Sequence, residues 1–244
     1  MWIAIRNQIV LWGGVIAAGL VCWQAAPHLR DSRGAMGPLV IFAEPQFGGI
    51  ASVVIVIAIS TAIACVVGKV VNAAVGWFVL GAGMYGLDYQ LESVRETAFA
   101  GHTLQFEWVE TGIMGIVLLG AVWIIWRVSG PLHDVHSIDD EEHPHEILSS
   151  EALKGLLATA VAIPVYWVIA RSPLKGQDVC AAFVGGMVGG LFGRLASPNV
   201  QPILIGVGPI FMGAIAQAVS VRFMHGTLDA AYVKGLVPPL NMVT

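Results

Sequence analysis

Formally charged residues are scarce in this sequence. Its 244 residues include 12 lysines and arginines and 16 aspartates and glutamates, so that only 11% of the chain is charged. Average soluble proteins carry about 25%. Hydrophobic residues make up 57% of the chain, and the mean hydropathy is +0.78. This composition excludes an ordinary soluble domain and predicts an integral membrane protein.

Basic residues and cysteines are also few. The formal net charge is −4, so nucleic acid is not an expected partner. The three cysteines, Cys22, Cys65 and Cys180, lie far apart, within or beside apolar runs. Cysteines in such places behave as small buried hydrophobes. Their spacing fits neither a disulfide framework nor a zinc knuckle.

Several apolar runs approach the length of about 20 residues that a helix needs to cross a bilayer. We count seven, and the second and third, separated only by Gly68 and Lys69, form a predicted helical hairpin. The expected fold is an all-α polytopic helical bundle with about seven transmembrane helices and short loops, as one transmembrane domain over residues 1–244. The predicted spans are Gln8–Trp23, Ile50–Val67, Val70–Leu87, Thr111–Trp126, Gly155–Ala170, Val179–Gly193 and Ile203–Val221.

The first run could alternatively be a signal peptide. The residues before Pro27 read Trp-Gln-Ala-Ala, a poor cleavage site, so we retain the run as a span. The loops that share a side with the C-terminus carry a small excess of basic residues, which favours a cytoplasmic C-terminus. We expect a multi-pass protein of a bacterial-type inner or plasma membrane.

Two segments outside the spans are predicted to be amphipathic helices. Leu91, Val94 and Ala98 recur at helical spacing between residues 88 and 99, and a second candidate covers Leu228–Leu236. Helices of this kind lie on a membrane surface or on the protein itself.

Glycines dominate the sixth span. Gly185, Gly189 and Gly193 repeat every four residues, and Gly186 and Gly190 repeat the same spacing one position later. Residues four apart share a helix face, so the pattern predicts a strip on which another helix backbone packs closely. A pore-lining or mobile helix is the alternative.

The seventh span contains a candidate helix break at Gly206, Gly208 and Pro209. Proline removes a backbone donor, and glycine loosens the turn before it. A plain structural kink is the simpler interpretation. In transporters, broken helices expose backbone groups that bind ions or substrates.

The loop at 127–154 is rich in acidic residues and histidines. Four imidazoles, at His133, His136, His143 and His145, lie among six carboxylates. These groups could bind a divalent metal such as zinc. Their spacing matches no defined site, however, so a solvated, self-repelling loop is the interpretation we favour. A docking surface for a basic partner is a third alternative.

Ionisable residues are absent from the interiors of the predicted spans. Because an ionisable group within the membrane is usually functional, this absence disfavours a proton-coupled carrier, an intramembrane hydrolase and a redox subunit. The sequence also has no HExxH or GxSxG motif. We therefore expect no catalytic residue and no cofactor apart from a weakly bound metal in the loop.

A non-catalytic structural or assembly subunit of a membrane complex is the function that these features favour. Its expected partners are the lipid bilayer and either other proteins or further copies of the chain. The first alternative is a carrier or channel for a neutral or weakly polar solute. The second is an interfacial lipid-modifying enzyme that uses loop carboxylates.

The carrier alternative rests on the order of the spans. Two triplets joined by the fourth span give a 3+1+3 plan that resembles the sugar-exporting and PQ-loop carriers. Pro45-Gln46 precedes the second span, and no second Pro-Gln follows. The resemblance is therefore one of helix plan, and no functional residue is carried over from it.

Overall fold

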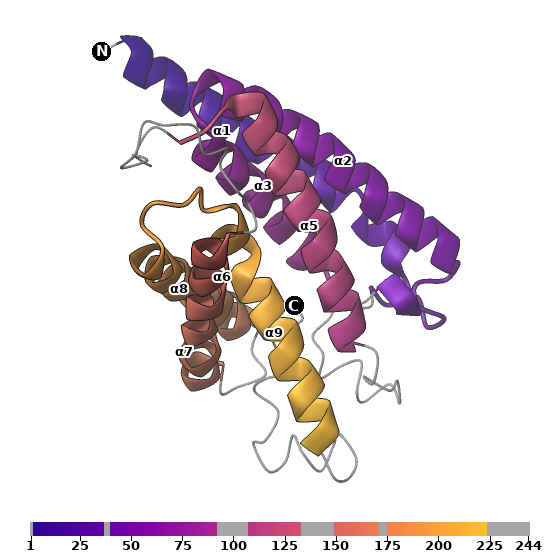
Figure 1. The fold of residues 1–244 in the computed structure, drawn as a ribbon. Helices are drawn as coiled ribbons and strands as arrows, with labels where there is room; N and C mark the ends of the chain where they lie inside the picture. The colour runs from indigo at the N-terminus through magenta and orange to yellow at the C-terminus, as the bar shows by residue number, and fades with distance from the viewer. Residues whose placement is uncertain (1, 37–39, 92–106, 133–148, 171–174, 224–244) are drawn as a thin grey trace. The chain divides into compact units, whose positions relative to one another are not determined.

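The computed structural model describes residues 2–36, 40–91, 107–132, 149–170 and 175–223 (Figure 1). Within these ranges the regular elements are helices, and the β-type pairing is an isolated bridge between Arg30 and Met36. The expected all-α class is confirmed for this part of the chain. The elements are α1 (Trp2–Trp23), η1 (Ala26–Leu29), η2 (Val40–Phe42), α2 (Gln46–Val70), α3 (Ala73–Asp88), α5 (Glu107–Ser129), α6 (Ser150–Ala158), η4 (Thr159–Val161), α7 (Ala162–Ile169), α8 (Lys175–Ala196) and α9 (Ile203–Phe223).

Five helical runs are long and apolar enough to cross a membrane. They are Trp2–Leu29, Gln46–Val70, Trp108–Ser129, Ser150–Ile169 and Val179–Ala196. Two further helices are shorter: α3 has 16 residues, and the apolar part of α9 is Ile203–Val219. The five runs suggest a membrane protein. A crossing by all seven predicted spans stays a prediction.

The turn of the predicted hairpin lies later in the chain than expected. Helix α2 continues through Gly68 and Lys69, and the turn falls at Val71 and Asn72. The Asn72 side chain accepts a hydrogen bond from the Val75 N–H at 2.9 Å, which caps the first turn of α3. The turn therefore lies at the capping residue Asn72, whereas Gly68 and Lys69 belong to the helix before it.

The fifth predicted span is a helical run with a change of geometry inside it. A 3₁₀ turn at Thr159–Val161 separates α6 from α7. Pro164 consequently lies in the first turn of α7, where a missing N–H removes no helical hydrogen bond. Ser149 begins the run by accepting a hydrogen bond from the Ala152 N–H at 3.0 Å.

The chain divides into two compact units, which we describe separately. The first unit comprises Met1–Leu91 and Leu118–Asp134, and the second comprises Glu92–Val117 and Val135–Thr244. Helix α5 contributes its first part to the second unit and its remainder to the first. Whether residues 1–244 form one transmembrane domain stays a prediction.

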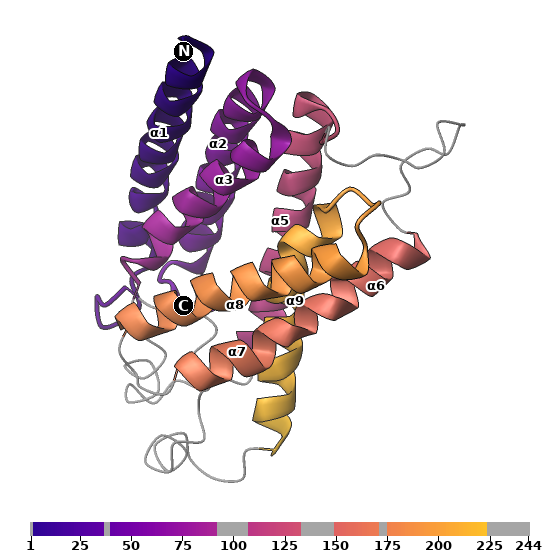
Figure 2. The same ribbon diagram turned by 90° about the vertical axis from the view of Figure 1, so that its left-hand side faces the viewer.

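In the first unit, α1, α2 and α3 pack side by side (Figure 2). Small residues bring their backbones together: a Cβ on Gly83 would lie 3.0 Å from the Ala18 Cβ, and one on Gly86 would lie 3.0 Å from the Gly19 carbonyl oxygen. The apolar side chains buried in this unit include Val53, Val56, Ile57, Val79, Leu80, Ala121, Val122 and Ile125.

Several polar side chains inside the first unit are bonded to their neighbours, whereas Trp126 Nε1 and Ser129 Oγ are buried without a partner in the described part of the chain. Cys22 Sγ lies 3.1 Å from Ser60 Oγ, which joins α1 to α2. The Thr61 hydroxyl donates to the Ile57 carbonyl at 2.7 Å, one turn earlier in the same helix. These bonds satisfy groups that would otherwise be costly to bury.

The connection between α1 and α2 contains a buried carboxylate. Asp31 accepts hydrogen bonds from the backbone N–H groups of Arg33 and Ala35, at 2.9 and 3.0 Å, and from Arg33 Nε at 2.7 Å. Its side chain is 1% exposed, whereas that of Arg33 is 43% exposed. Burial raises the pKa of Asp31, but the hydrogen bonds from Arg33 and Ala35 and the Arg33 charge outweigh burial and lower the pKa below its ordinary value.

In the second unit, α8 lies beside the run formed by α6, η4 and α7, and α9 packs against both (Figure 2). The early part of α5 contacts α9, because a Cβ on Gly115 would lie 3.0 Å from the Phe211 ring. Buried apolar side chains include Ala162, Tyr166, Ala181, Ile203, Leu204, Ile205 and Val207.

Candidate functional site

One of the two glycine rows of α8 faces the α6–α7 run. A Cβ on Gly189 would lie 3.1 Å from both the Ala162 Cβ and the Thr159 carbonyl oxygen, and one on Gly193 would lie 3.0 Å from the Gly155 carbonyl oxygen. At Gly185 the nearest atom, the Ala162 carbonyl oxygen, is 3.4 Å away. These helices approach closely enough that side chains at Gly189 and Gly193 would meet the neighbouring backbone.

The other row lies in a different environment. A Cβ on Gly186 or Gly190 would have no atom within 4 Å in the described part of the chain, apart from the near backbone of its own helix. The sequence pattern treats both rows as one packing strip, whereas the structure separates them. The reason is geometric, since a helical step of about 100° turns adjacent residues toward different neighbours.

Helix α9 is continuous through the candidate break, so the chain does not leave the helical conformation at Gly206, Gly208 or Pro209. A proline inside a helix removes one backbone hydrogen bond and more often bends the helix than ends it. Gly208 provides a close approach: a Cβ there would lie 2.5 Å from Thr159 Oγ1. Gly206 is exposed and has open space around it.

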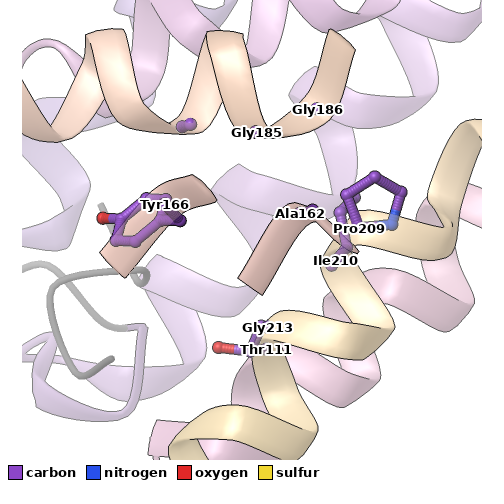
Figure 3. Close-up of a pocket in the computed structure, with 9 residues that line it drawn as sticks. Thr111, Ala162, Tyr166, Gly185, Gly186, Pro209, Ile210 and Gly213 are labelled. Carbon is purple, nitrogen blue, oxygen red and sulfur yellow. The ribbon is translucent and has the colours of Figure 1, made fainter. Parts of the chain in front are cut away.

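A cavity of about 150 Å³ lies within the second unit, at the meeting of α5, α7, α8 and α9. Figure 3 shows Tyr166 on one side of the cavity and Pro209 on the other, with Gly185 and Gly186 on the α8 side. Glycines and alanines form much of the wall, which therefore exposes backbone. The lining residues are Thr111, Ala162, Tyr166, Ala182, Gly185, Gly186, Pro209, Ile210 and Gly213.

Gln217 lies one helical turn beyond Gly213 on α9. Its side chain is fully buried, and neither Oε1 nor Nε2 has a hydrogen-bond partner in the described part of the chain. Pro209, Gly213 and Gln217 are spaced by four residues and share one helix face. Pro209 and Gly213 line the cavity, whereas Gln217 is not among its lining residues and its side chain is inaccessible to a water-sized molecule.

Two other polar side chains of this unit bond to backbone carbonyl groups near its turns. The Ser197 hydroxyl donates to the Glu151 carbonyl, which links the end of α8 to the start of α6. The Arg194 guanidinium donates to the Val200 carbonyl at 2.8 Å and so stays at the turn between α8 and α9. Lys69 is exposed in the last turn of α2. In the described helical runs, charged residues lie near the ends.

The candidate metal ligands His133, His136, His143 and His145 lie outside the described residues, as do the predicted helix at Leu228–Leu236 and most of the one at 88–99. Among the described residues, no group of three or more histidine, cysteine or acidic side chains could hold a metal ion. The cysteines are free: Cys22 is buried, Cys65 half-buried and Cys180 exposed. Metal binding by the loop stays a prediction.

The sequence interpretation anticipated part of this site. It singled out the α8 glycines and Pro209. It did not identify Thr111, Tyr166 or Gly213 as neighbours of these residues. The four-residue spacing of Pro209, Gly213 and Gln217 is a signal in the sequence, because it predicts that these residues share one face of α9.

Comparison with known proteins gives no relative: no family model, no curated protein and no solved structure matches this chain.

Proposed function

We propose that this chain is a non-catalytic, polytopic membrane protein that acts as a structural or assembly subunit of a membrane complex. The observation that carries the proposal is the use of polar side chains in the first unit. Ser60 pairs with Cys22, Thr61 bonds to its own helix, and Asn72 caps α3. A solute path needs polar groups on its walls, whereas these three side chains form bonds within or between helices.

The outer faces of the helices favour the same function. Large apolar side chains are exposed along α1, including Trp2, Ile9, Trp12 and Ile16. Contiguous apolar surface of this kind is covered by lipid or by a partner protein. Lipid, a partner protein and a second copy of the chain are therefore the contacts we propose for this surface.

Purification of the tagged full chain from its native membrane in mild detergent tests the proposal. Cross-linking before extraction and native mass spectrometry afterwards would measure the stoichiometry. We expect a fixed ratio, either with a partner chain or between copies of this chain. A monomer that carries only lipid, both before and after cross-linking, would contradict the subunit proposal.

One observation favours a carrier or channel for a neutral solute as the second candidate. A cavity of about 150 Å³ lies within the second unit, and the hydroxyl-bearing residues Thr111 and Tyr166 are among those that line it. Proteoliposomes loaded with neutral solutes of increasing size would distinguish the two functions. Saturable efflux that Gly186→Leu, a substitution in the cavity wall, abolishes would favour the carrier.

A further inference from the structure

We propose that the cavity of the second unit holds a short segment of the acyl chain of a membrane lipid. The volume of about 150 Å³ sets the length at about six carbon atoms, because an apolar protein cavity of this size holds a molecule such as benzene. A lipid site inside the second unit goes beyond the proposed subunit function, in which lipid covers outer surfaces, although it rests on the same membrane location.

The wall of the cavity suits hydrocarbon. None of the lining residues is formally charged, and the polar side chains among them are those of Thr111 and Tyr166. The other lining residues are glycine, alanine, proline and isoleucine. A buried water needs about two to four polar partners, and an empty space leaves the apolar wall without contacts on one side. Hydrocarbon supplies these contacts and requires no hydrogen bond.

The cavity has an exposed rim and a buried floor. Ala182 is an exposed lining residue, whereas Ala162, Gly185 and Gly213 are buried (Figure 3). Phe183, next to Ala182 on α8, is apolar and 64% exposed. A cavity of this shape admits one part of a long molecule while the remainder stays outside. The acyl chain of a lipid meets this condition.

The depth of the cavity matches the acyl-chain region of a bilayer. Gly186 lies near the middle of the apolar run Val179–Ala196, and Pro209 lies near the middle of the apolar part of α9. Tyr166 lies about one turn before the end of its run. If these helices cross the membrane, the cavity extends from the middle of the bilayer toward one surface, within the hydrocarbon core of about 30 Å.

A photoreactive phospholipid tests the occupant. The full chain is reconstituted in nanodiscs that contain a small fraction of phosphatidylcholine with a diazirine in one acyl chain, and mass spectrometry maps the adducts after irradiation. We expect cavity adducts at Ala162 and Tyr166, which are buried and line the cavity. We expect a surface adduct at Val168, which is exposed on the same helix and does not line the cavity. A lipid with the diazirine in its headgroup should give no cavity adducts.

Two substitutions on α8 test the location. Gly186→Leu places a side chain in the cavity, because a Cβ on Gly186 enters open space. It should remove the cavity adducts and keep the surface adduct. Gly190→Leu is the matched control and should keep both, because Gly190 is also open but does not line the cavity. If Gly186→Leu does not yield folded protein, Ile210→Trp narrows the cavity from the α9 side and replaces it in the comparison.

Three results would overturn the lipid site and leave the proposed function intact. The first is a surface adduct without cavity adducts in the natural chain. The second is cavity adducts that persist in Gly186→Leu, or that Gly190→Leu removes to the same extent. The third is cavity adducts from the headgroup-labelled lipid. Absence of the surface adduct together with the cavity adducts would instead contradict the membrane location, and both proposals would then fail.

Discussion

At the scale of single residues, two glycines of α3 show how strongly the local contacts of this fold differ. A Cβ on Gly76 would lie 2.7 Å from both the Ala64 carbonyl oxygen and Ile125 Cγ2, whereas Gly81 has nothing within 4 Å. A carbonyl oxygen of a packed helix cannot move aside as a flexible side chain can. The contacts of Gly76 therefore exclude even a methyl group.

We expect Gly76→Ala to destabilise the protein by about 1–3 kcal/mol, the usual cost of overpacking. Gly81→Ala is its control on the same helix and should be neutral or stabilising by up to about 1 kcal/mol, because alanine restricts the unfolded chain. Thermal unfolding in one detergent measures both. Equal midpoints for the two variants would show that α2, α3 and α5 do not pack as described.

Asp31 gives a prediction about pH. Its pKa is lower in the folded chain than the ordinary value of 3.8, so the unfolded chain binds a proton first as the pH falls. The stabilisation from this carboxylate is therefore complete well above pH 3.8 and is lost as the pH drops through the lower folded pKa. Asp31→Asn should lower the unfolding temperature at pH 7, and the difference from the natural chain should shrink toward pH 3.

The control for Asp31→Asn is Glu44→Gln, which removes an exposed carboxylate from the same connection. It should leave the unfolding temperature at pH 7 nearly unchanged. A gap between the Asp31→Asn variant and the natural chain that is constant from pH 7 to pH 3 would mean that ionisation of Asp31 does not contribute.

At the scale of elements, the two glycine rows of α8 predict opposite responses to the same substitution. Gly189→Leu would force a side chain against Ala162, Thr159 and Pro209, at a typical cost of about 1–3 kcal/mol. Gly190→Leu enters open space and should have little effect on stability. Melting curves measure the unfolding temperature of both variants. An equal decrease in unfolding temperature for both would contradict the finding that the two glycine rows have different neighbours.

Hydropathy was sufficient to predict the helices of this fold, because long apolar runs leave few alternatives to a helix. It did not predict their ends. Gly68 lies inside α2, where a Cβ would meet the side chains of Ser129 and Ile125, which are remote in sequence. The cavity could not be predicted from the sequence for the same reason. Thr111, Tyr166 and Gly213 lie on separate helices and become neighbours only when these helices pack.

At the scale of the whole molecule, the number of crossings determines which loops share a side of the membrane. If α2 and α3 both cross, the connection before α2 and the segment after α3 face the same side. If α3 does not cross, they face opposite sides. The span count can therefore be measured with two loop positions.

Single cysteines at Ser32 and Gly101, each in a chain whose native cysteines are replaced by alanine, provide the test. We expect a membrane-impermeant maleimide to label both positions from the same side of intact cells or vesicles. Under the predicted orientation, that side is the cytoplasm. A cysteine at Asn72 is the control and should react from the opposite side. Labelling of the first two positions from opposite sides would exclude the seven-span arrangement.

The turn at Val71 and Asn72 also has a consequence for how the protein is made. A connection this short ties the end of α2 to the start of α3, so neither helix can leave the translocon far ahead of the other. The 16 residues of α3 are fewer than a bilayer usually requires, whereas α2 has 25 residues and a hydropathy of 2.8. In a microsomal insertion assay, we expect α3 alone not to insert into the membrane and α3 preceded by α2 to insert. The strongly apolar α2 would then promote insertion of the shorter α3 during synthesis.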